Sequence, residues 1–591
     1  MLALTILNRL RRICSALKLI IERIMRRRKV FLVGIKKYQD RIIYQIYPKS
    51  FRDSNGDGIG DLRGIIGKLE YLKDLGVNTI WLNPIFVSPQ VDNGYDVSNY
   101  YALDEKMGTL HDFDEFVETA HSLGLDVILD FVMNHTSDKH PWFKDAIANE
   151  RSLYRDYYLW AKGKDGKLPN NWGSFFGGSV WEKDPQADDV YYFHLFDKKM
   201  PDLNWRNPEV RRSMADIAKF WIDHGVDGFR LDAFIHIAKA DFEQNMPSHG
   251  KKGPIVAEPF FANMPLVQTY LHEFVKTLRE YKPDIFILGE AASADIDLAV
   301  DYTDPSKEMC DTVVTFRYFE DDKSKLDPEL PEFGQPLPLK IETFKDTMVT
   351  WQKRLQKISY PTLYWNNHDM PRVLTRFAAE SEHKKAAAKM LATLMYLQRG
   401  VPCIYYGEEI GMESAVLPKI SDFEDRQADE FFKEAKEAGA TEEKCLSMLS
   451  RSHKMAARTV MQWNESEYYG FSATKPWKYG QTNDVNVANE QSDGTSILNF
   501  YKSVLKLKKK PLFVEGNFVL ADTTDDLYVY KRTLGDSEAW VICNLADAVT
   551  KYRVRGNLSD KHIVLQNGSL SLNEENVLTL PPFGSIVFMT E

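Results

Sequence analysis

The chain of 591 residues is predicted to be an α/β protein built on a (β/α)8 TIM barrel, with a subdomain inserted after the third strand and an all-β domain at the C-terminus. From residue 41 onward, short runs rich in Val, Ile and Tyr alternate with amphipathic stretches of helical periodicity. Such alternation is typical of parallel strands joined by helices. After about residue 512 the helical stretches give way to short strand-like runs, which predict the all-β domain.

Eight apolar runs are interpreted as the strands of the barrel. They lie at residues 42–47, 79–82, 126–131, 228–231, 285–288, 312–316, 362–365 and 403–406. Helices are predicted between them, for example over 62–75 and 112–123, because apolar residues recur there every three or four positions. Eight strand–helix units in sequence favour a closed barrel.

The spacing of these units predicts the domain organisation. Residues 38–135 and 209–512 are assigned to the barrel. Residues 136–208, rich in Trp, Gly, Asn and Pro, are too long for a simple connection and predict a subdomain over the barrel mouth. Residues 513–591 are assigned to a C-terminal β-sandwich domain, with strands near 527–530, 539–543 and 563–565.

The first 37 residues differ in character from the rest. They hold eleven Lys and Arg but one acid, Glu22, and their apolar residues recur at helical spacing. The charges interrupt any apolar run long enough to cross a membrane, and no small-residue cleavage site follows. We expect a basic amphipathic extension that is irrelevant to catalysis. Weak association with a membrane surface is the alternative.

Charge and cysteine content limit the possible partners. The whole chain carries −10 and the extension +10, so residues 38–591 carry −20, which disfavours nucleic-acid binding. The five cysteines are scattered and odd in number, which argues against a disulfide framework and for a reducing, cytoplasmic compartment. No zinc-type spacing occurs. We expect a monomer or homodimer without an organic cofactor.

Carboxylates follow three of the predicted strands. The fourth strand ends at Asp232, the fifth at Glu290 and the seventh at Asp369, while the third runs into His135. Active sites of such barrels lie at the carboxyl ends of the strands. Like charges gathered there raise at least one pKa, as a general acid near neutral pH requires. Two carboxylates flanking a glycosidic bond are the usual arrangement for glycoside hydrolysis, so the pattern predicts a glycosidase.

The segments around these residues resemble the signature regions of glycoside hydrolase family 13, the α-amylase family, and within it the oligo-1,6-glucosidase and α-glucosidase branch. The resemblance covers about residues 40–591. It is carried by YQIYPKSFRDSNGDGIGDLRGI, DFVMNHTS, GFRLDA, GE, NNHDMPR and ARTVMQW.

The resemblance implies the roles of the catalytic residues. Asp232 would attack the anomeric carbon and form a β-glucosyl-enzyme. Glu290 would protonate the leaving oxygen and then activate water. Asp369 would bind sugar hydroxyls in the transition state. The residues expected to contact the same glucose or to orient the nucleophile are His135, His368 and Arg230.

The motif DNGYD resembles the branch's clamp for the terminal glucose. Asp92 would hold the non-reducing end and Tyr95 would stack on the sugar ring, which favours an exo-acting pocket. A simple turn is the alternative. The branch usually has an arginine four residues before the position of Arg458, but this chain has Lys454. Lysine cannot make a planar bidentate contact, so the exo preference is expected to be weaker.

The motif DSNGDGIGD predicts a metal site. Asp53, Asn55, Asp57 and Asp61 recur at even spacing, and oxygen ligands of this kind suit Ca²⁺. The resemblance adds the carbonyl of Ile59 and implies structural calcium, with Mg²⁺ as the alternative ion. An Asp/Asn turn without an ion is the other interpretation.

The resemblance also bears on the substrate. In this branch valine after the nucleophile tends to accompany α-1,6 bonds, whereas this chain has Ala233. We therefore expect a retaining, exo-acting α-glucosidase that favours α-1,4-linked maltose and maltooligosaccharides, with isomaltose-type substrates as the alternative. One side chain carries about 1–3 kcal/mol of such a preference. A glucosyl transferase or isomerase similar to sucrose isomerase or trehalose synthase, and a non-catalytic carbohydrate-binding or transporter-associated relative, are the competing hypotheses.

Overall fold

The computed structural model describes residues 38–250, 252–323, 327–336, 338–480, 483–521, 524, 526–555 and 561–590. The predicted extension, residues 1–37, lies outside them. Among the described helices, none combines the length and the apolar character needed to cross a membrane. The four described cysteines, Cys310, Cys403, Cys445 and Cys543, are buried and free.

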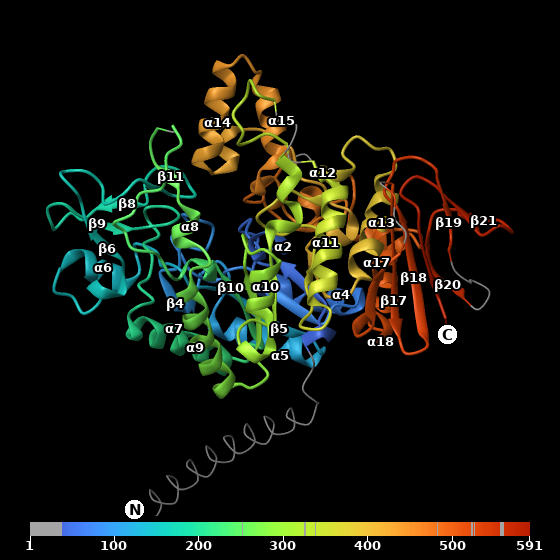
Figure 1. Ribbon diagram of the computed structural model, residues 1–591, viewed down its shortest axis with the longest axis horizontal. Helices are drawn as coiled ribbons and strands as arrows, with labels where there is room; N and C mark the ends of the chain where they lie inside the picture. The colour runs from blue at the N-terminus through green and yellow to red at the C-terminus, as the bar shows by residue number, and fades with distance from the viewer. Residues whose placement is uncertain are drawn as a thin grey trace, which may run out of the picture.

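Eight parallel strands form the barrel (Figure 1), in the order β13-β12-β10-β5-β2-β1-β15-β14. Between the two end strands, the hydroxyls of Thr312 and Thr362 lie 3.0 Å apart, so the barrel is nearly closed. Each predicted strand overlaps an observed one, which confirms the predicted fold. The strands are β1 Ile43–Ile46, β2 Thr79–Leu82, β5 Asp126–Val132, β10 Gly228–Asp232, β12 Phe286–Glu290, β13 Thr312–Val314, β14 Thr362–Leu363 and β15 Val401–Tyr405.

Register between strands positions the polar side chains at the barrel mouth. Arg230 on β10 pairs with Asp130 on β5, so the two side chains lie on the same side of the sheet. Close strand contact at the start of β10 requires glycine, because a Cβ at Gly228 would lie 2.4 Å from the carbonyl oxygen of Phe286. This tight approach lets β10 and β12 present Asp232 and Glu290 at adjacent strand ends.

The helix predicted over 62–75 is two helices, α3 Leu62–Ile66 and α4 Leu69–Leu75. The break lies at Gly67, whose N–H donates to the carbonyls of Arg63 and Ile65 and thereby ends α3. The next helix, α5 Leu110–Ser122, begins two residues earlier than predicted, because Thr109 and Asp112 form a capping box. Its buried face packs on the barrel, as the apolar periodicity predicts.

The insertion after β5 forms a small subdomain, drawn in teal at the left of Figure 1. Its three-stranded sheet comprises β6 Trp160–Lys162, β9 Val190–Phe193 and β8 Trp181–Lys183. Its short strand β7 Trp172–Gly173 pairs with β11 Ile255–Val256, which follows β10 in the chain. Ala257 and Phe261 from that later segment complete the apolar core. The predicted bounds 136–208 do not include this contribution.

Two antiparallel sheets form the C-terminal domain, which confirms its predicted all-β character. Leu527 and Val529 on the large sheet face the core shared with the small sheet. Tyr528 and Tyr530 belong to the core of the barrel, and the hydroxyl of Tyr530 donates to Leu394 in helix α13 Lys384–Tyr396. The strands are β16 Asn517–Leu520, β17 Leu527–Leu534, β18 Ser537–Asn544, β23 Ser585–Met589 and β20 His562–Asn567 in the large sheet, and β19 Thr550–Arg553, β22 Val577–Leu580 and β21 Ser571–Leu572 in the small one.

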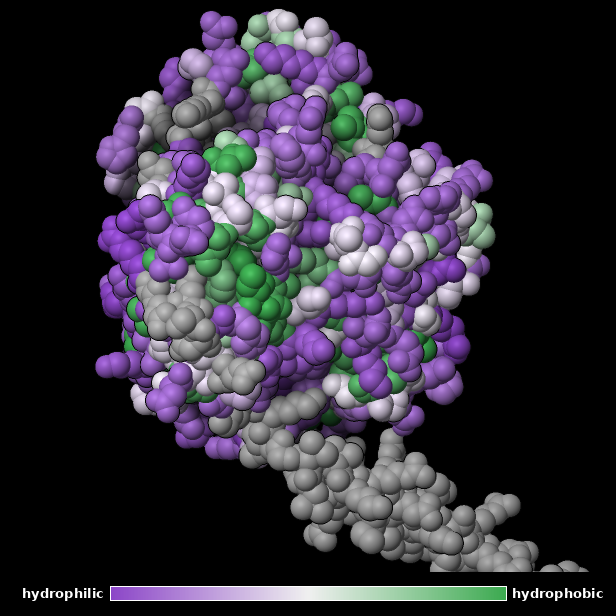
Figure 2. Space-filling model, turned by 90° about the vertical axis from the view of Figure 1, so that its right-hand side faces the viewer, coloured by the Kyte–Doolittle hydropathy of each residue, from purple (hydrophilic) through white to green (hydrophobic). Residues whose placement is uncertain are grey.

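Figure 2 views the side on which these sheets lie, and most of its surface is hydrophilic, with a limited band of apolar atoms. The exposed large apolar side chains of this domain include Val519, Val549, Ile563 and Leu572.

A helical hairpin, α14 Arg426–Glu437 and α15 Glu442–Ser452, projects at the top of Figure 1 and was not predicted. Its own small core includes Phe423, Phe431 and Leu449. The hairpin matters for the site because the chain that leaves α15 carries Lys454 and Arg458 to the barrel mouth.

Candidate active site

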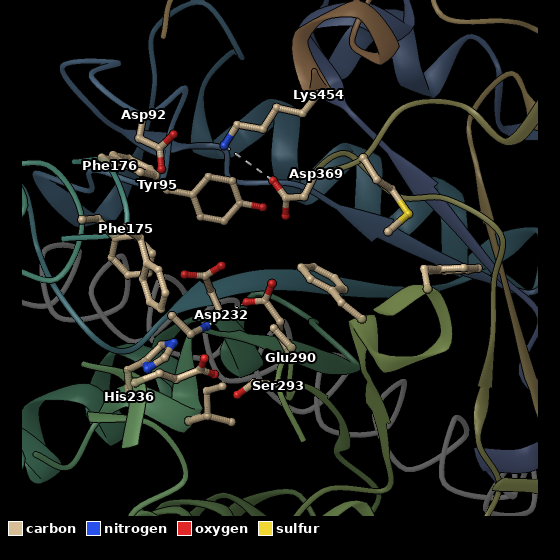
Figure 3. A pocket seen from close by; sticks show the side chains of 18 of the residues that line it. Asp92, Tyr95, Phe175, Phe176, Asp232, His236, Glu290, Ser293, Asp369 and Lys454 are labelled. Atoms are coloured by element: carbon tan, nitrogen blue, oxygen red, sulfur yellow. Dashed lines mark hydrogen bonds and ion pairs between the residues drawn. The ribbon is translucent and has the colours of Figure 1, made fainter. Parts of the chain in front are cut away.

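A cavity of about 840 Å³ opens at the carboxyl ends of the barrel strands. Figure 3 shows acidic side chains from several strand ends facing one another across it. Nine of the predicted residues line it: Asp92, Tyr95, His135, Asp232, Ala233, Glu290, Asp369, Lys454 and Arg458. Arg230 and His368 lie beneath them and contact their side chains. The five predicted metal-site residues are not part of this lining.

One guanidinium group binds three carboxylates under the cavity floor. Arg230 Nη1 lies 2.5 Å from Asp232 Oδ1 and 2.6 Å from Asp130 Oδ1, and its Nη2 lies 2.9 Å from Glu290 Oε1. Arg230 is buried. If all four groups are ionised, this cluster has a net charge of −2 in a site with little water, which favours retention of a proton.

The pKa values in the cluster follow from this arrangement. Burial raises the pKa of Asp232 well above its usual value, Glu290 and Asp130 raise it further, and Arg230 opposes the shift. Burial likewise raises the pKa of Asp130 to about 6, again against the charge of Arg230. The cluster can therefore hold a proton at the mildly acidic to neutral pH at which a general acid must work.

Asp130 was not predicted as part of the site. It is buried and accepts hydrogen bonds from Tyr95 Oη at 2.9 Å, and from Trp81 Nε1 and Asn83 Nδ2, each at 3.2 Å. Because Asp130 lies within a strand and not at its carboxyl end, the neighbouring sequence does not mark it as a site residue. Only the pairing of β5 with β10 places it opposite Arg230.

The backbone after Asp232 orients Glu290. Ala233 has a left-handed conformation with φ of +49°, and its N–H donates to Glu290 Oε2 at 3.0 Å. This conformation is unfavourable for β-branched residues, so a small side chain suits the position. Glu290 is thereby held by one backbone amide and one arm of Arg230.

Asp369 lies in a second cluster across the cavity. Its carboxylate lies 3.2 Å from His368 Nε2, 3.1 Å from Arg458 Nη2 and 3.8 Å from Lys454 Nζ. Burial alone would raise the pKa of Asp369, but these three neighbours hold it below its usual value. Asp369 is therefore a permanently charged acceptor for ligand hydroxyls.

His368 is fixed in one tautomer. The amide nitrogen of Gln45 donates to its Nδ1 at 2.8 Å, and burial lowers the pKa of His368 well below its usual value. The neutral ring therefore carries its proton on Nε2, toward Asp369 and the hydroxyl of Tyr95. The ring of Tyr95 stacks on His368 with centroids 5.5 Å apart.

His135 has an unused hydrogen-bonding atom at the cavity. It is buried, and its Nε2 has no partner within the described part of the chain. Burial lowers the pKa of His135 to about 4, so the ring is neutral near pH 7. A ligand hydroxyl can therefore pair with this atom, which would otherwise stay buried and unsatisfied.

The predicted clamp residues Asp92 and Lys454 both line the cavity but do not pair with each other in the described part of the chain. Lys454 points to Asp369, as the dashed line in Figure 3 shows, and among the described residues the carboxylate of Asp92 forms no ion pair. Burial raises the pKa of Asp92 to about 6, against the charges of Lys454 and Arg458. Arg458 also donates from Nε to the His368 carbonyl at 2.8 Å, which fixes its position.

Aromatic side chains that the prediction did not assign to the site also line the cavity. Phe175, Phe176 and Phe196 come from the inserted subdomain, and Phe316 follows β13. The many aromatic residues of the insertion indicated that some of them could line the cavity. Which rings face the cavity depends on how the subdomain packs, and the sequence does not show this. Flat apolar rings suit the faces of sugar rings.

The predicted metal loop lies away from this cavity. Asp53 accepts hydrogen bonds from the amides of Asn55, Gly56 and Gly58 and from the hydroxyl of Ser472, and Asp61 accepts from Ser54 and Gly64. Asp57 and Asn55 each accept one amide. No three His, Cys, Asp or Glu side chains gather closely enough to hold a metal in the described ranges. Carbonyl and amide oxygens would have to complete a calcium site, and the ion stays a prediction.

The chain was compared with known proteins. The family profile "Alpha amylase, catalytic domain" matches residues 45–516. The chain is 39% identical to the oligo-1,6-glucosidase of Parageobacillus thermoglucosidasius over 547 residues, which cover 91% of this chain and 96% of the relative. A solved "Family GH13_31 enzyme" is 50% identical, with a TM-score of 0.86 and coverage of 94% of this chain and 99% of the other. The trehalulose synthase MutB of Pseudomonas mesoacidophila is 32% identical, with a TM-score of 0.86 and coverage of 94% and 99%. The chain thus belongs to glycoside hydrolase family 13, the α-amylase family, and is an enzyme of its α-glucosidase type.

Proposed function

We propose that the enzyme hydrolyses the terminal α-glucosidic bond of short oligosaccharides with retention of configuration, with Asp232 as nucleophile and Glu290 as acid/base. The observation that carries the proposal is Arg230, whose two arms bind both carboxylates. A bridge of one guanidinium favours the separation of about 5–5.5 Å that retaining enzymes use over the wider spacing of inverting ones.

In the first step, Glu290 transfers its proton to the glycosidic oxygen while Asp232 attacks the anomeric carbon. The bond from that carbon to the oxygen breaks, the leaving sugar departs as an alcohol, and a β-glucosyl ester forms on Asp232. In the second step, water gives a proton to Glu290 and attacks the same carbon, which releases α-glucose and restores the Asp232 carboxylate.

The proposed roles require Asp232 to be ionised, and Arg230 opposes the burial that raises the pKa of this carboxyl. Arg230 lies closest to Asp232, at 2.5 Å, and stabilises its ionised form. The net charge of −2 in the fully ionised cluster favours retention of one proton, and the proposed first step requires that proton on Glu290. Formation of the ester on Asp232 removes one negative charge from the cluster, and Glu290, which has already given its proton to the leaving sugar, is then the base that accepts a proton from water.

The second cluster supports glucose binding. Asp369, held ionised by its neighbours, would accept hydrogen bonds from sugar hydroxyls, while His368 and the free Nε2 of His135 offer further polar contacts. Such bonds can strengthen as positive charge develops on the sugar ring. Asp92 and Tyr95 would hold the non-reducing end and favour exo action. Lys454 would assist them more weakly than an arginine at that position.

Two observations favour different glucosidic linkages. Ala233 favours α-1,4-linked maltose and maltooligosaccharides, whereas the name of the relative at 39% identity favours α-1,6 bonds. The likeness to a trehalulose synthase supports an isomerase or transferase as the second candidate, because it would differ only in what intercepts the glucosyl ester. A cytoplasmic location and a structural calcium ion stay predictions from the sequence.

The purified enzyme should be assayed on maltose, isomaltose, sucrose and trehalose, with products identified by chromatography and the first-formed anomer by proton NMR. We expect free α-glucose from maltose or isomaltose. An isomerised disaccharide from sucrose would favour the second candidate. First-formed β-glucose would contradict retention, and full activity of Asp232→Asn would contradict the assigned nucleophile.

A further inference from the structure

The clamp loop, residues 88–96, places the side chains of Asp92 and Tyr95 at the active-site cavity (Figure 3). The Asp92 carboxylate forms no ion pair among the described residues, because Lys454 points to Asp369 at 3.8 Å. The position of the Asp92 side chain therefore depends on what holds the backbone of the clamp loop.

The backbone of the clamp loop is left-handed on either side of Asp92. Gln90 has a φ of +66° and Asn93 a φ of +52°. Residues other than glycine adopt this region rarely, Asn less rarely than Gln, and keep it where the surrounding contacts hold it. The loop therefore needs contacts that hold both residues in place.

Asp96 holds the clamp loop from inside. This side chain is fully buried, and its Oδ1 accepts hydrogen bonds from the amide of Asp92 at 3.1 Å and from the hydroxyl of Ser88 at 2.8 Å. Its Oδ2 accepts from the amide of Val91 at 2.9 Å. These bonds join parts of the same loop, so they fix its shape and leave its attachment to the barrel to other contacts.

Lys49 supplies such an attachment from the short helix α2 Pro48–Phe51, which follows β1. Its Nζ donates to Asn93 Oδ1 at 3.1 Å and to Gln90 Oε1 at 3.3 Å, which are the two left-handed residues of the loop. The same ammonium lies 4.1 Å from the ring centre of Trp477, in a cation–π contact. One ammonium group thus joins both left-handed residues and is itself held by an aromatic ring.

The surroundings of Lys49 differ from those of an ordinary surface lysine. Most lysines are exposed, whereas Lys49 is half-buried and has fixed partners. It forms no ion pair within the described ranges, so no carboxylate competes with the two amide oxygens for its donors. Gln90 is held at its other end as well, because its Nε2 donates to Asp104 Oδ2 at 3.1 Å. These contacts tie the clamp loop to α2 and to Trp477.

We propose that Lys49 is a positioning residue that fixes the clamp loop relative to the cavity and thereby sets how tightly Asp92 holds the terminal glucose. The inference rests on the proposed function, which assigns Asp92 to the non-reducing end. Lys49 does not line the cavity, so it acts on the substrate through Asp92. Without the ammonium, the backbone at Gln90 and Asn93 relaxes and the contact of Asp92 with the sugar weakens, while the reacting carboxylates stay in place.

The test compares 4-nitrophenyl α-glucoside with its 4-deoxy analogue, which lacks the hydroxyl that marks the non-reducing end. We expect the native full-length enzyme to prefer the unmodified substrate in kcat/KM by at least about tenfold, because a hydrogen bond to a charged group is lost with the hydroxyl. In Lys49→Met we expect this preference to fall at least about threefold, with KM for the unmodified substrate raised and kcat within about twofold of the native value. A general loss of folding would lower both activities and leave the preference unchanged.

Two variants serve as controls. Lys49→Arg keeps a charged donor over Trp477, and its preference should stay within about twofold of the native one. Lys68→Met removes a lysine whose ammonium also lies 4.1 Å from the centre of a tryptophan ring, that of Trp463. Within the described residues Lys68 makes no side-chain hydrogen bond to the clamp loop, so this variant should keep the native preference.

The inference is overturned by a preference that stays at the native value in Lys49→Met, or that falls as far in Lys68→Met. If Lys49→Met does not fold, Asn93→Gly decides, because it removes one acceptor of the ammonium and permits the left-handed backbone. We expect its preference to fall at least about twofold, and a native preference in that variant overturns the inference.

The native enzyme separates this inference from the proposed function. Hydrolysis of the glucoside and of its 4-deoxy analogue at equal kcat/KM overturns the inference and leaves the proposed hydrolysis intact. No hydrolysis of 4-nitrophenyl α-glucoside, maltose or isomaltose overturns the proposed function and with it the inference.

Discussion

The single guanidinium group of Arg230 contacts three acidic side chains, so one positive charge faces three carboxyl groups in the site. Two of the acids, Asp232 and Glu290, reach the cavity, while Asp130 lies beneath and faces Tyr95. Asp130 is therefore a positioning residue whose charge acts on the reacting groups through Arg230. Lysine at position 230 could not bind all three acids in this geometry.

The Asp130→Asn variant tests the electrostatic role of this residue. Its charge helps to raise the pKa of Asp232, so removing it should lower that pKa. Asp232 must be ionised to attack, and we therefore expect the acidic limb of the pH profile of kcat/KM to move to lower pH, by up to about one unit or 1.4 kcal/mol. A limb that stays in place, in a variant whose melting temperature matches the native enzyme, would show that Asp130 has only a structural role.

At the scale of elements, the strands and their catalytic ends could be predicted because each carries a local signal. An apolar run predicts each of β10 and β12; Asp232 follows the first run directly, and Glu290 follows the second after Gly289. Asp130 carried no such signal, since its role depends on the register of β5 against β10. The completion of the inserted subdomain by Ala257 and Phe261, and the hairpin of α14 and α15, depend on packing between distant segments, which periodicity does not report.

Glu408, in the turn after β15, is a buried acid that links several elements and makes stability depend on pH. Glu408 accepts hydrogen bonds from Asn366, from Tyr396 on α13 and from Tyr501 on α17 Ile497–Lys508. Burial raises the pKa of Glu408 to about 8. The folded state thus keeps a proton that the unfolded chain has lost, so the contribution of Glu408 to stability should fall by about 1.4 kcal/mol per pH unit between roughly pH 4.5 and 8.

We predict that Glu408→Gln, which mimics the protonated acid, removes this dependence. Its melting temperature should exceed that of the native enzyme at pH 8 and differ little at pH 5, as measured by thermal denaturation at both values. A variant that is less stable than the native enzyme at pH 8 would contradict the raised pKa of the Glu408 carboxyl.

The predicted metal site lies in the loop between β1 and α3, and removal of calcium tests it. It contacts a distant segment through Ser472 and through Trp477, whose N–H donates to the carbonyl of Gly58. If calcium binds there, its removal by a chelator should lower the melting temperature, and added Ca²⁺ should restore it. The kcat/KM below the melting range should change little, because the loop does not line the cavity. An unchanged melting temperature would favour the Asp/Asn turn without an ion.

At the scale of the whole molecule, the barrel, the inserted subdomain and the hairpin together form the cavity, while the C-terminal sheets pack on α13 at another side (Figure 1). Residues 1–37 are predicted to have no part in catalysis. Deleting them should therefore leave kcat/KM on the preferred glucoside within about twofold of the full chain, less than about 0.5 kcal/mol. A loss of tenfold or more, with an unchanged melting temperature, would assign the extension a role in activity.

The identity of the nucleophile is the central claim, and trapping the covalent intermediate tests it most directly. The enzyme should be incubated with 5-fluoro-α-glucosyl fluoride, which forms the glycosyl ester quickly and loses it slowly, and then digested and mapped by mass spectrometry. The account predicts a fluoroglucosyl ester on Asp232, in the peptide that contains Gly228–Asp232. An ester on Glu290 or Asp369, or no ester while the substrate is turned over, would contradict it.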